Sequence, residues 1–364
     1  MRHMMVVAWG GGYGHATRCL AIADVFGREG WKVTVVGAAE LGAFLRKAEQ
    51  LNVVVYPDVL CCGGPWSCWG EVDYVAESLL SDIALLRSIS PDVVIHDLRP
   101  TMPVACEKLG VPHIAVVQSV DVPGFRYPWA ASVPDLWVKC LPAFTKVLDE
   151  HKVRAPVREL RELFVRGPCI VPSFPELDPI PDDIKSTYIG ALNCSCGDDV
   201  ANLHGRYVFA YGVPFTTDGL SIVSNALTQI RVGLVVGGMR PDVLVGRASD
   251  VSVHEFVAVN RIWENIDAVL CHGGHGTCMA ALVHGVPLVV VPRSRAERKL
   301  NGQRLEGLGC ARCVGGAVVD WKEVQDALGS VLRESGFREA ATRWGRRIEL
   351  LRGREALLNL VDTL

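Results

Sequence analysis

Two glycine-rich turns that each carry histidine are the segments of this chain best suited to chemistry. Residues 10–18 read GGGYGHATR, and residues 270–277 read LCHGGHGT. Glycines allow a backbone to approach a ligand closely, and the N-terminus of a helix that follows such a turn favours an anion. Histidine can exchange a proton near neutral pH. The two turns together predict a negatively charged ligand and a reaction that moves a proton.

The first turn does not have the spacing of a dinucleotide-binding fingerprint. Gly12 and Gly14 would require a third glycine at position 17, where Thr17 stands. A tight turn without a ligand is an alternative for these glycines considered alone. His15 at the end of the turn favours the functional interpretation.

Each turn is expected to join a strand to a helix in a parallel sheet, because β-branched runs alternate with amphipathic segments. In the first half the expected strands are residues 4–8, 31–37, 53–56, 91–97 and 111–117, and the expected helices are residues 15–26, 39–50 and 102–109. In the second half the expected strands are residues 207–211, 233–236, 266–271 and 287–291, and the expected helices are residues 220–230, 275–284 and several after residue 321.

A proline-rich segment separates the two halves. Residues 172–181 read PSFPELDPIP, and four prolines in ten residues exclude both helix and strand. We expect this segment to be the connection between two α/β domains. The carboxyl ends of both sets of strands should then face a cleft between the domains, where such sheets bind ligands. The expected domains are residues 1–187 and 188–345, with a helix at 346–364 packing back toward the first.

Length and composition agree with a folded protein of two domains. The chain has 364 residues, of which 49% are hydrophobic and 21% charged, so there is enough apolar side chain to bury. A net charge of −3 argues against a broad nucleic-acid-binding face. Apolar runs such as residues 286–291 are far shorter than a membrane span. The start lacks a signal-peptide cleavage site, so we expect a cytoplasmic protein that could also be peripheral at the membrane.

The chain resembles the GT-B glycosyltransferases, the superfamily of the UDP-glucuronosyl and macrolide glycosyltransferases and the MurG-like enzymes. The motifs that carry the resemblance are residues 10–26, 91–97, 272–292 and 301–309, of which the third, HGGHGTCMAALVHGVPLVVVP, is the most specific. They look like the acceptor-side loop and helix, the fourth-strand region, the donor-binding signature and its continuation. The resemblance implies an α/β fold with two Rossmann-like, doubly wound parallel-sheet domains facing a central cleft, the first for the acceptor and the second for the nucleotide sugar.

The resemblance also implies roles for particular residues. His15 matches the histidine that deprotonates the acceptor hydroxyl, and Asp97 matches the aspartate that orients it. The residues expected to bind the nucleotide sugar are Gly12, Gly14, His272, Gly273, Gly274, His275, Gly276, Thr277, Glu297, Arg298 and Asn301. An acceptor alcohol needs such a base because its own pKa lies far above 7.

The chain departs from the family pattern at two places. Ala280 stands where many members have a glutamate that binds the ribose, and Glu297 with Arg298 stands where members have Asp-Gln or Glu-Gln before the asparagine. UDP is the commonest donor nucleotide among the relatives, and we expect it here. Glu297 could bind sugar hydroxyls or be a solvated charge. The basic residues between 293 and 299 could contact a phosphate or an anionic lipid surface.

The expected function is inverting, metal-independent transfer of a sugar from a nucleotide diphosphate to an acceptor hydroxyl. The expected donor is a UDP-sugar. No Asp-x-Asp motif of the metal-dependent enzymes is present, and a helix N-terminus with His272 could stabilise the leaving diphosphate without a metal. No cofactor is expected beyond the donor. The expected partners are that nucleotide sugar and an alcohol that could be lipid-linked, with no nucleic acid.

Two alternatives remain open at this point. A UDP-sugar 2-epimerase shares the two-domain architecture, although epimerases need further carboxylates in the cleft. A non-catalytic subunit that binds a nucleotide sugar is a second alternative, which Ala280 favours and the presence of His15 with Asp97 disfavours.

Aromatic residues of the first half have two interpretations. Trp66, Trp69, Trp129 and Trp137 could form platforms for a sugar or an isoprenoid chain, or could be ordinary packing residues. His96 adjoins Asp97 but should point to the other face of its strand, since side chains alternate along a strand.

Overall fold

The chain forms two compact units, Met1–Cys194 with Leu351–Leu364, and Ser195–Leu350. The sequence pattern predicts the corresponding limits at residues 187 and 345. The computed structural model describes residues 1–8, 13–37, 44–45, 52–55, 66–129, 136–153, 157–191, 204–238, 251–255, 257, 262–316 and 318–364. The assignment of the acceptor to the first unit and of the nucleotide sugar to the second remains a prediction.

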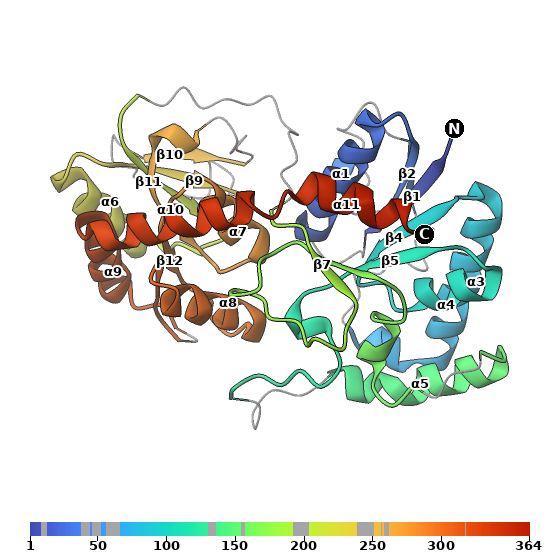
Figure 1. The fold of residues 1–364 in the computed structure, drawn as a ribbon. Coiled ribbons are helices and arrows are strands. Elements are labelled where there is room, and N and C mark those ends of the chain that lie inside the picture. Colours follow the sequence, from blue (N-terminus) through green and yellow to red (C-terminus); the bar gives the residue numbers. More distant parts are fainter. Residues whose placement is uncertain are drawn as a thin grey trace. The chain divides into compact units, whose positions relative to one another are not determined.

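The first unit contains a seven-stranded parallel sheet in the order β3-β2-β1-β4-β5-β6-β7 (Figure 1). Its strands are β1 (His3–Ala8), β2 (Lys32–Gly37), β3 (Asn52–Val55), β4 (Val93–Asp97), β5 (His113–Val116), β6 (Cys169–Val171) and β7 (Ser186–Tyr188). The order reverses between β1 and β4, which is the mark of a doubly wound sheet. The fold class expected from the sequence is confirmed, and β6 and β7 extend the sheet by two short strands that the sequence pattern does not reveal.

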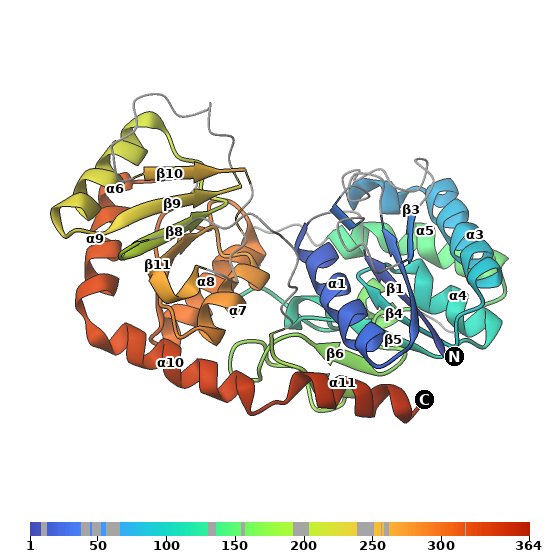
Figure 2. The same ribbon diagram turned by 90° about the horizontal axis from the view of Figure 1, so that it is seen from above.

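Helices cover both faces of this sheet (Figure 2). The helices of the first unit are α1 (Tyr13–Arg28), α3 (Val72–Ile89), α4 (Thr101–Leu109) and α5 (Leu136–Glu150), with short 3₁₀ helices η2 (Trp66–Gly70), η3 (Ser119–Asp121) and η5 (Leu160–Leu163). Helices α3, α4 and α5 share one hydrophobic core with Met5, Val7 and Val94 of the sheet. Helix α1 follows β1 on the opposite face. The helix expected at residues 39–50 lies outside the described residues except for 44–45.

The proline-rich segment at residues 172–181 is not the interdomain connection, and that expectation is wrong. It joins β6 to β7 within the first sheet, and the unit boundary follows later. Phe174 and Leu177 are buried, and the Asp178 carboxylate accepts a hydrogen bond of 2.8 Å from the backbone N–H of Ser119. Prolines exclude regular structure here, but they do not prevent the segment from packing into the core.

The second unit has a six-stranded parallel sheet in the order β10-β9-β8-β11-β12-β13. Its strands are β8 (Tyr207–Tyr211), β9 (Gly233–Gly237), β10 (Val251–His254), β11 (Ile266–Cys271), β12 (Leu288–Val290) and β13 (Ala311–Cys313). Its helices are α6 (Thr217–Gln229), η8 (Trp263–Asn265), α7 (His275–Val283), α8 (Ala296–Gly307), α9 (Trp321–Arg333) and α10 (Ser335–Glu349). Helices α6 and α9 share a core with the sheet. Of the helices in the described ranges, none is long and apolar enough to cross a membrane.

The last helix, α11 (Gly353–Asp362), belongs to the first unit and packs beside β7 (Figure 1). Arg2 pairs with Asp362 at 2.8 Å, and Arg354 pairs with Glu29. The Cα of Gly353 lies so close to the carbonyl of Ile189 that a Cβ would overlap it. A glycine at the start of α11 therefore sets how closely this helix approaches the sheet.

We expect Gly353→Ala to destabilise the first unit by about 1–3 kcal/mol, because a methyl group there must displace backbone. The matched control is Gly336→Ala in the first turn of α10, where a Cβ meets open space and alanine should stabilise the helix slightly. Urea unfolding followed by circular dichroism measures both variants. Equal stability of the two variants would contradict the close packing of α11.

Candidate functional site

Asp97 is the last residue of β4, at the carboxyl end of the first sheet. Side chains alternate along a strand, and Val94 faces the core shared with α3, α4 and α5. Asp97 must then face the other side, where α1 lies. Its neighbour in the sheet is Ala8, the last residue of β1, which is the strand that precedes α1 in the chain. The topology alone thus directs Asp97 toward the first turns of α1.

His15, in the first turn of α1, pairs with Asp97. Its Nδ1 lies 2.9 Å from Oδ1 of the carboxylate, and the imidazole side chain is 20% exposed while Asp97 is fully buried. The two residues that the resemblance assigns to one dyad are therefore brought together from distant parts of the sequence. In the tautomer with the proton on Nδ1, the imidazole donates to this carboxylate and its Nε2 can accept a proton.

Arg18 is a third member of this cluster, and the sequence motifs assign it no role. Its guanidinium donates from Nε to Oδ2 of Asp97 at 3.0 Å and from Nη2 to Oδ1 at 3.0 Å. Nη1 donates to Gln118, just after β5, at 3.2 Å. The i, i+3 spacing of His15 and Arg18 on one helical face is the sequence signal that could have identified it.

The charges of this cluster support one another. Burial acts to raise the pKa of Asp97, but the charge of Arg18 and the hydrogen-bonded His15 outweigh it, so the pKa lies below its usual value. Burial likewise acts to lower the pKa of Arg18, and the Asp97 carboxylate reverses the direction. The aspartate is therefore ionised and the arginine charged throughout the physiological pH range.

The turn after Asp97 is held from its other side by a second buried ion pair. Leu98 has a positive φ of 52°, which is unfavourable for a side chain of that size. Arg99 donates from Nε to Asp82 of α3 at 2.9 Å, and Thr101 donates to the same carboxylate at 2.6 Å. These contacts hold the strained turn, and with it the position of Asp97, against α3.

His96 does not join the cluster, which agrees with its expected orientation. Its Nε2 lies 3.2 Å from Nδ1 of His113, and burial lowers the pKa of both imidazoles. Trp69 and Trp137 are core residues, so the packing interpretation holds for these two. Trp129 stacks on Tyr127 in a half-buried position, and the side chain of Trp66 lies outside the described part of the chain.

In the second unit, the glycine-rich turn joins β11 to α7, as expected. Gly273 has a φ of 83°, and a Cβ there would approach the carbonyl oxygen of Arg298 to 2.7 Å. Asn301 of α8 is 5% exposed and donates from Nδ2 to the carbonyl of Gly273 at 3.0 Å. Two candidate residues thus have structural roles, since Gly273 permits close packing of the turn against α8 and Asn301 fixes its backbone.

The N-terminus of α7 presents backbone N–H groups. Gly274 is the N-cap residue and, within the described residues, no side chain caps this end and no acidic residue lies in the first turn. His275 is buried, Gly276 is exposed and Thr277 is half-buried. Unsatisfied N–H groups and the helix dipole make such an end favourable for an anion.

His272 is held between two glycines. Its Nδ1 lies 3.3 Å from the carbonyl of Tyr211, and a Cβ at either Gly212 or Gly274 would overlap the imidazole. Burial, followed by the nearby charge of Arg298, lowers the pKa of His272. The ring is neutral at pH 7 and donates from Nδ1, so its Nε2 carries a lone pair rather than a proton.

The basic residues around the start of α8 include Arg298, which lies against this turn. The side chains of Arg293, Arg295 and Arg298 form no hydrogen bond or ion pair with any residue that the structure describes. Burial, and then the charges of Arg295 and Arg293, lower the pKa of Arg298, although Glu297 acts in the opposite direction. Arg298 is half-buried and pairs with no side chain in the described ranges, which indicates a place for an anion.

The two remaining candidates lie in the first glycine turn. Gly12 falls outside the described residues, and Gly14 is exposed in the first turn of α1 with open space around it. No group of three or more His, Cys, Asp or Glu side chains in the described ranges is arranged to hold a metal ion.

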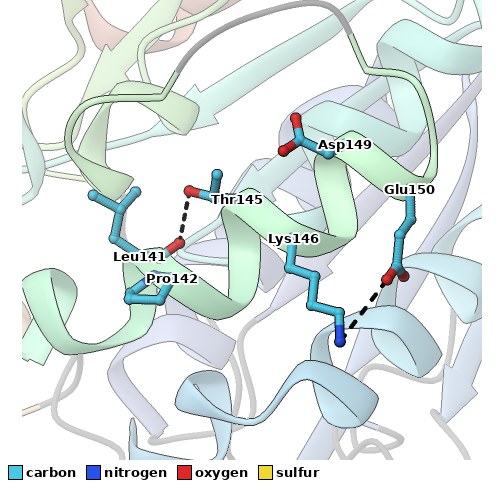
Figure 3. Close-up of a pocket in the computed structure, with 6 residues that line it drawn as sticks. All are labelled: Leu141, Pro142, Thr145, Lys146, Asp149 and Glu150. Carbon is cyan, nitrogen blue, oxygen red and sulfur yellow. Dashed lines mark hydrogen bonds and ion pairs between the residues drawn. The ribbon is translucent and has the colours of Figure 1, made fainter.

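A surface pocket on α5 contains none of the candidate residues (Figure 3). Two of its polar side chains are satisfied within the helix, since Thr145 donates to the carbonyl of Leu141 at 3.0 Å and Lys146 pairs with Glu150 at 4.0 Å. Pro142 and Asp149 complete its lining. We therefore assign this pocket no part in the candidate site.

Sequence comparisons point to one group of enzymes. Residues 238–348 match the family model described as the erythromycin biosynthesis protein CIII-like C-terminal domain. A PGL/p-HBAD biosynthesis glycosyltransferase of Mycobacterium tuberculosis is 25% identical over 297 residues, covering 73% of this chain and 68% of the relative. A glycosyltransferase of Methanosarcina acetivorans is 22% identical over 388 residues, covering 99% of this chain and 97% of the relative.

Solved structures share the whole fold. The glycosyltransferase of kitacinnamycin has a TM-score of 0.77 at 18% identity, covering 100% of this chain and 98% of the other. The calicheamicin glycosyltransferase CalG4 has a TM-score of 0.76 at 20% identity with the same coverage. The fold, the matched C-terminal domain and the named relatives together confirm the superfamily recognised in the sequence, the GT-B glycosyltransferases that include the macrolide enzymes.

Proposed function

We propose that this protein transfers a sugar from a nucleoside diphosphate to an acceptor hydroxyl by direct displacement, with inversion at the anomeric carbon and without a metal ion. The observation that carries the proposal is the contact of His15 with the buried, ionised Asp97 at the carboxyl end of the first sheet. A partly exposed imidazole held by a buried carboxylate is the arrangement of a general base.

In this proposal Nε2 of His15 accepts the proton of the acceptor hydroxyl while the new C–O bond forms. Asp97 holds the tautomer with the proton on Nδ1 and stabilises the imidazolium that results. General-base assistance of this kind contributes typically about 10²–10⁴ in rate. The 20% exposure of the imidazole leaves the ring accessible to an acceptor.

The donor diphosphate would bind in the second unit, at the N-terminus of α7 and beside Arg298. Three residues of the first turn, His275, Gly276 and Thr277, offer backbone N–H groups to a phosphate. Neutral His272 donates from Nδ1 to Tyr211 and adds no positive charge of its own. Arg298 is therefore the side chain that we assign to the charge of the leaving diphosphate, with Glu297 near the sugar.

The structural neighbours support a nucleoside diphosphate as the donor's leaving group, and two of them bind a thymidine nucleotide. The spinosyn rhamnosyltransferase SpnG has been solved with thymidine diphosphate, and the glycosyltransferase VinC with dTDP. UDP-sugars remain our first choice, and dTDP-sugars are the second. SpnG has also been solved with the spinosyn aglycone, which supports an acceptor molecule distinct from the donor. We further propose that the acceptor is lipid-linked and that the protein is cytoplasmic with peripheral contact to a membrane.

We expect His15→Ala to lower kcat for transfer by about 10²–10⁴ while the affinity for the nucleotide is unchanged, because the variant loses the base and not the donor site. The assay uses radiolabelled UDP-, dTDP- and GDP-sugars with a lipid or glycan extract, and follows nucleotide release and product. His204→Ala, a variant of an exposed histidine in the second unit, is the control. Undiminished transfer by His15→Ala would contradict the mechanism.

The same assay separates the alternatives. Epimerisation of the sugar in the absence of any acceptor would favour a nucleotide-sugar 2-epimerase. Binding of the nucleotide sugar with no turnover in any extract would favour a non-catalytic subunit. Transfer with inverted anomeric configuration, measured by NMR of the product, is the result that we expect.

We expect Arg298→Gln to weaken UDP binding by about 10–100-fold, because one hydrogen bond to a charged group is worth about 1.5–3 kcal/mol. Calorimetric titration with UDP measures the dissociation constant. Arg333→Gln removes the same charge from an exposed side chain of α9 and is the matched control. Equal loss in both variants would indicate a long-range effect of charge, and wild-type affinity of Arg298→Gln would remove this residue from the site.

Transfer should survive removal of divalent cations, since Arg298 and the N-terminus of α7 are assigned the charge that a metal would otherwise stabilise. The measurement compares initial rates before and after dialysis against EDTA. Loss of activity that Mn²⁺ or Mg²⁺ restores would show this part of the proposal to be wrong.

A further inference from the structure

The Asp97 carboxylate does not serve His15 alone. Oδ1 accepts from Nδ1 of His15 at 2.9 Å and from Nη2 of Arg18 at 3.0 Å, while Oδ2 accepts from Nε of Arg18 at 3.0 Å. In a simple His–Asp dyad the imidazolium would be the only positive charge that interacts with the carboxylate. Here a permanent cation already neutralises it before any proton arrives.

Arg18 also contacts the imidazole directly. Its Nη2 lies 3.0 Å from Nδ1 of His15, and the arginine side chain is only 11% exposed. A proton on His15 would therefore place a second positive charge against a buried guanidinium.

Two further groups in the described part of the chain act electrostatically on Arg18. Asp121 of η3 is one of them, and its carboxylate accepts from the backbone N–H of Gln118 at 3.0 Å. Gln118 is uncharged and binds Nη1 of Arg18. Cys19 is buried, and burial raises the pKa of its thiol, so it stays neutral.

We propose that Arg18 is a positioning residue for the base: it fixes both oxygens of Asp97 in the orientation that His15 requires, and it places a fixed positive charge against the imidazole that accepts the proton. The inference rests on the proposed function for its meaning in catalysis. The effect of the Arg18 charge on the titration midpoint of His15 is a property of the free protein and can be measured without substrate.

The test is a pH titration of the histidine ring nitrogens by long-range ¹H–¹⁵N NMR, with the His15 signal assigned by its loss in His15→Gln. In Arg18→Gln we expect the midpoint of His15 to rise by about one pH unit or more, since a nearby charge has been removed. In Arg18→Lys, which keeps the charge, the midpoint should stay close to that of the wild type. A folded Arg18→Gln protein with the wild-type midpoint would overturn the inference.

Arg18→Gln leaves Asp97 buried without its main partner and could fail to fold. The double variant Arg18→Gln/Asp97→Asn removes both charges and is compared with Asp97→Asn alone. We expect a higher His15 midpoint in the double variant than in Asp97→Asn, and equal midpoints would overturn the inference.

Rate measurements then separate this inference from the proposed function. If His15 is the base, the acidic limb of the kcat/KM profile should move to higher pH in Arg18→Gln together with the NMR midpoint. A midpoint that moves while the acidic limb stays in place would uphold the effect of Arg18 on His15 and would instead remove His15 from the role of base.

Discussion

The buried Asp97 carboxylate is the interaction on which the first unit's candidate site depends. Burial of a charge is costly unless the charge is paired and hydrogen-bonded, and here His15 and Arg18 of α1 both bind it. The same contacts attach the start of α1 to the end of β4. The residue that would orient the base is thus also a residue that holds the base's helix on the sheet.

The candidate site of the second unit has an excess of positive charge. Its glycine turn and α7 present N–H groups, and Arg293, Arg295 and Arg298 add positive charge that Glu297 offsets only in part. Mutual repulsion of these arginines is a cost to the free protein that a bound diphosphate would remove. The charge cluster of the first unit is therefore internally paired, whereas that of the second unit has excess positive charge. This difference is consistent with a positioned base in the first unit and a bound anion in the second.

Much of the architecture could be predicted because long parallel strands are continuous apolar runs followed by glycine turns, as at residues 4–14 and 266–277. The three-residue strands β6 and β13 lack enough pattern to be recognised. The prediction of an interdomain connection at residues 172–181 is wrong because proline restricts the local backbone conformation but does not determine whether a segment is buried. The resemblance identifies His15 and Asp97. The i, i+3 spacing places Arg18 on the helical face of His15, but its contact with Asp97 follows only from the sheet topology, which turns Asp97 toward α1.

Asp97 is expected above all to hold His15 in the tautomer that can act as a base. The ¹⁵N chemical shifts of the His15 ring at neutral pH report this tautomer directly. We predict a proton on Nδ1 and an unprotonated Nε2 in the free protein. A protonated Nε2, with Nδ1 accepting from Arg18 instead, would contradict the central role given to Asp97.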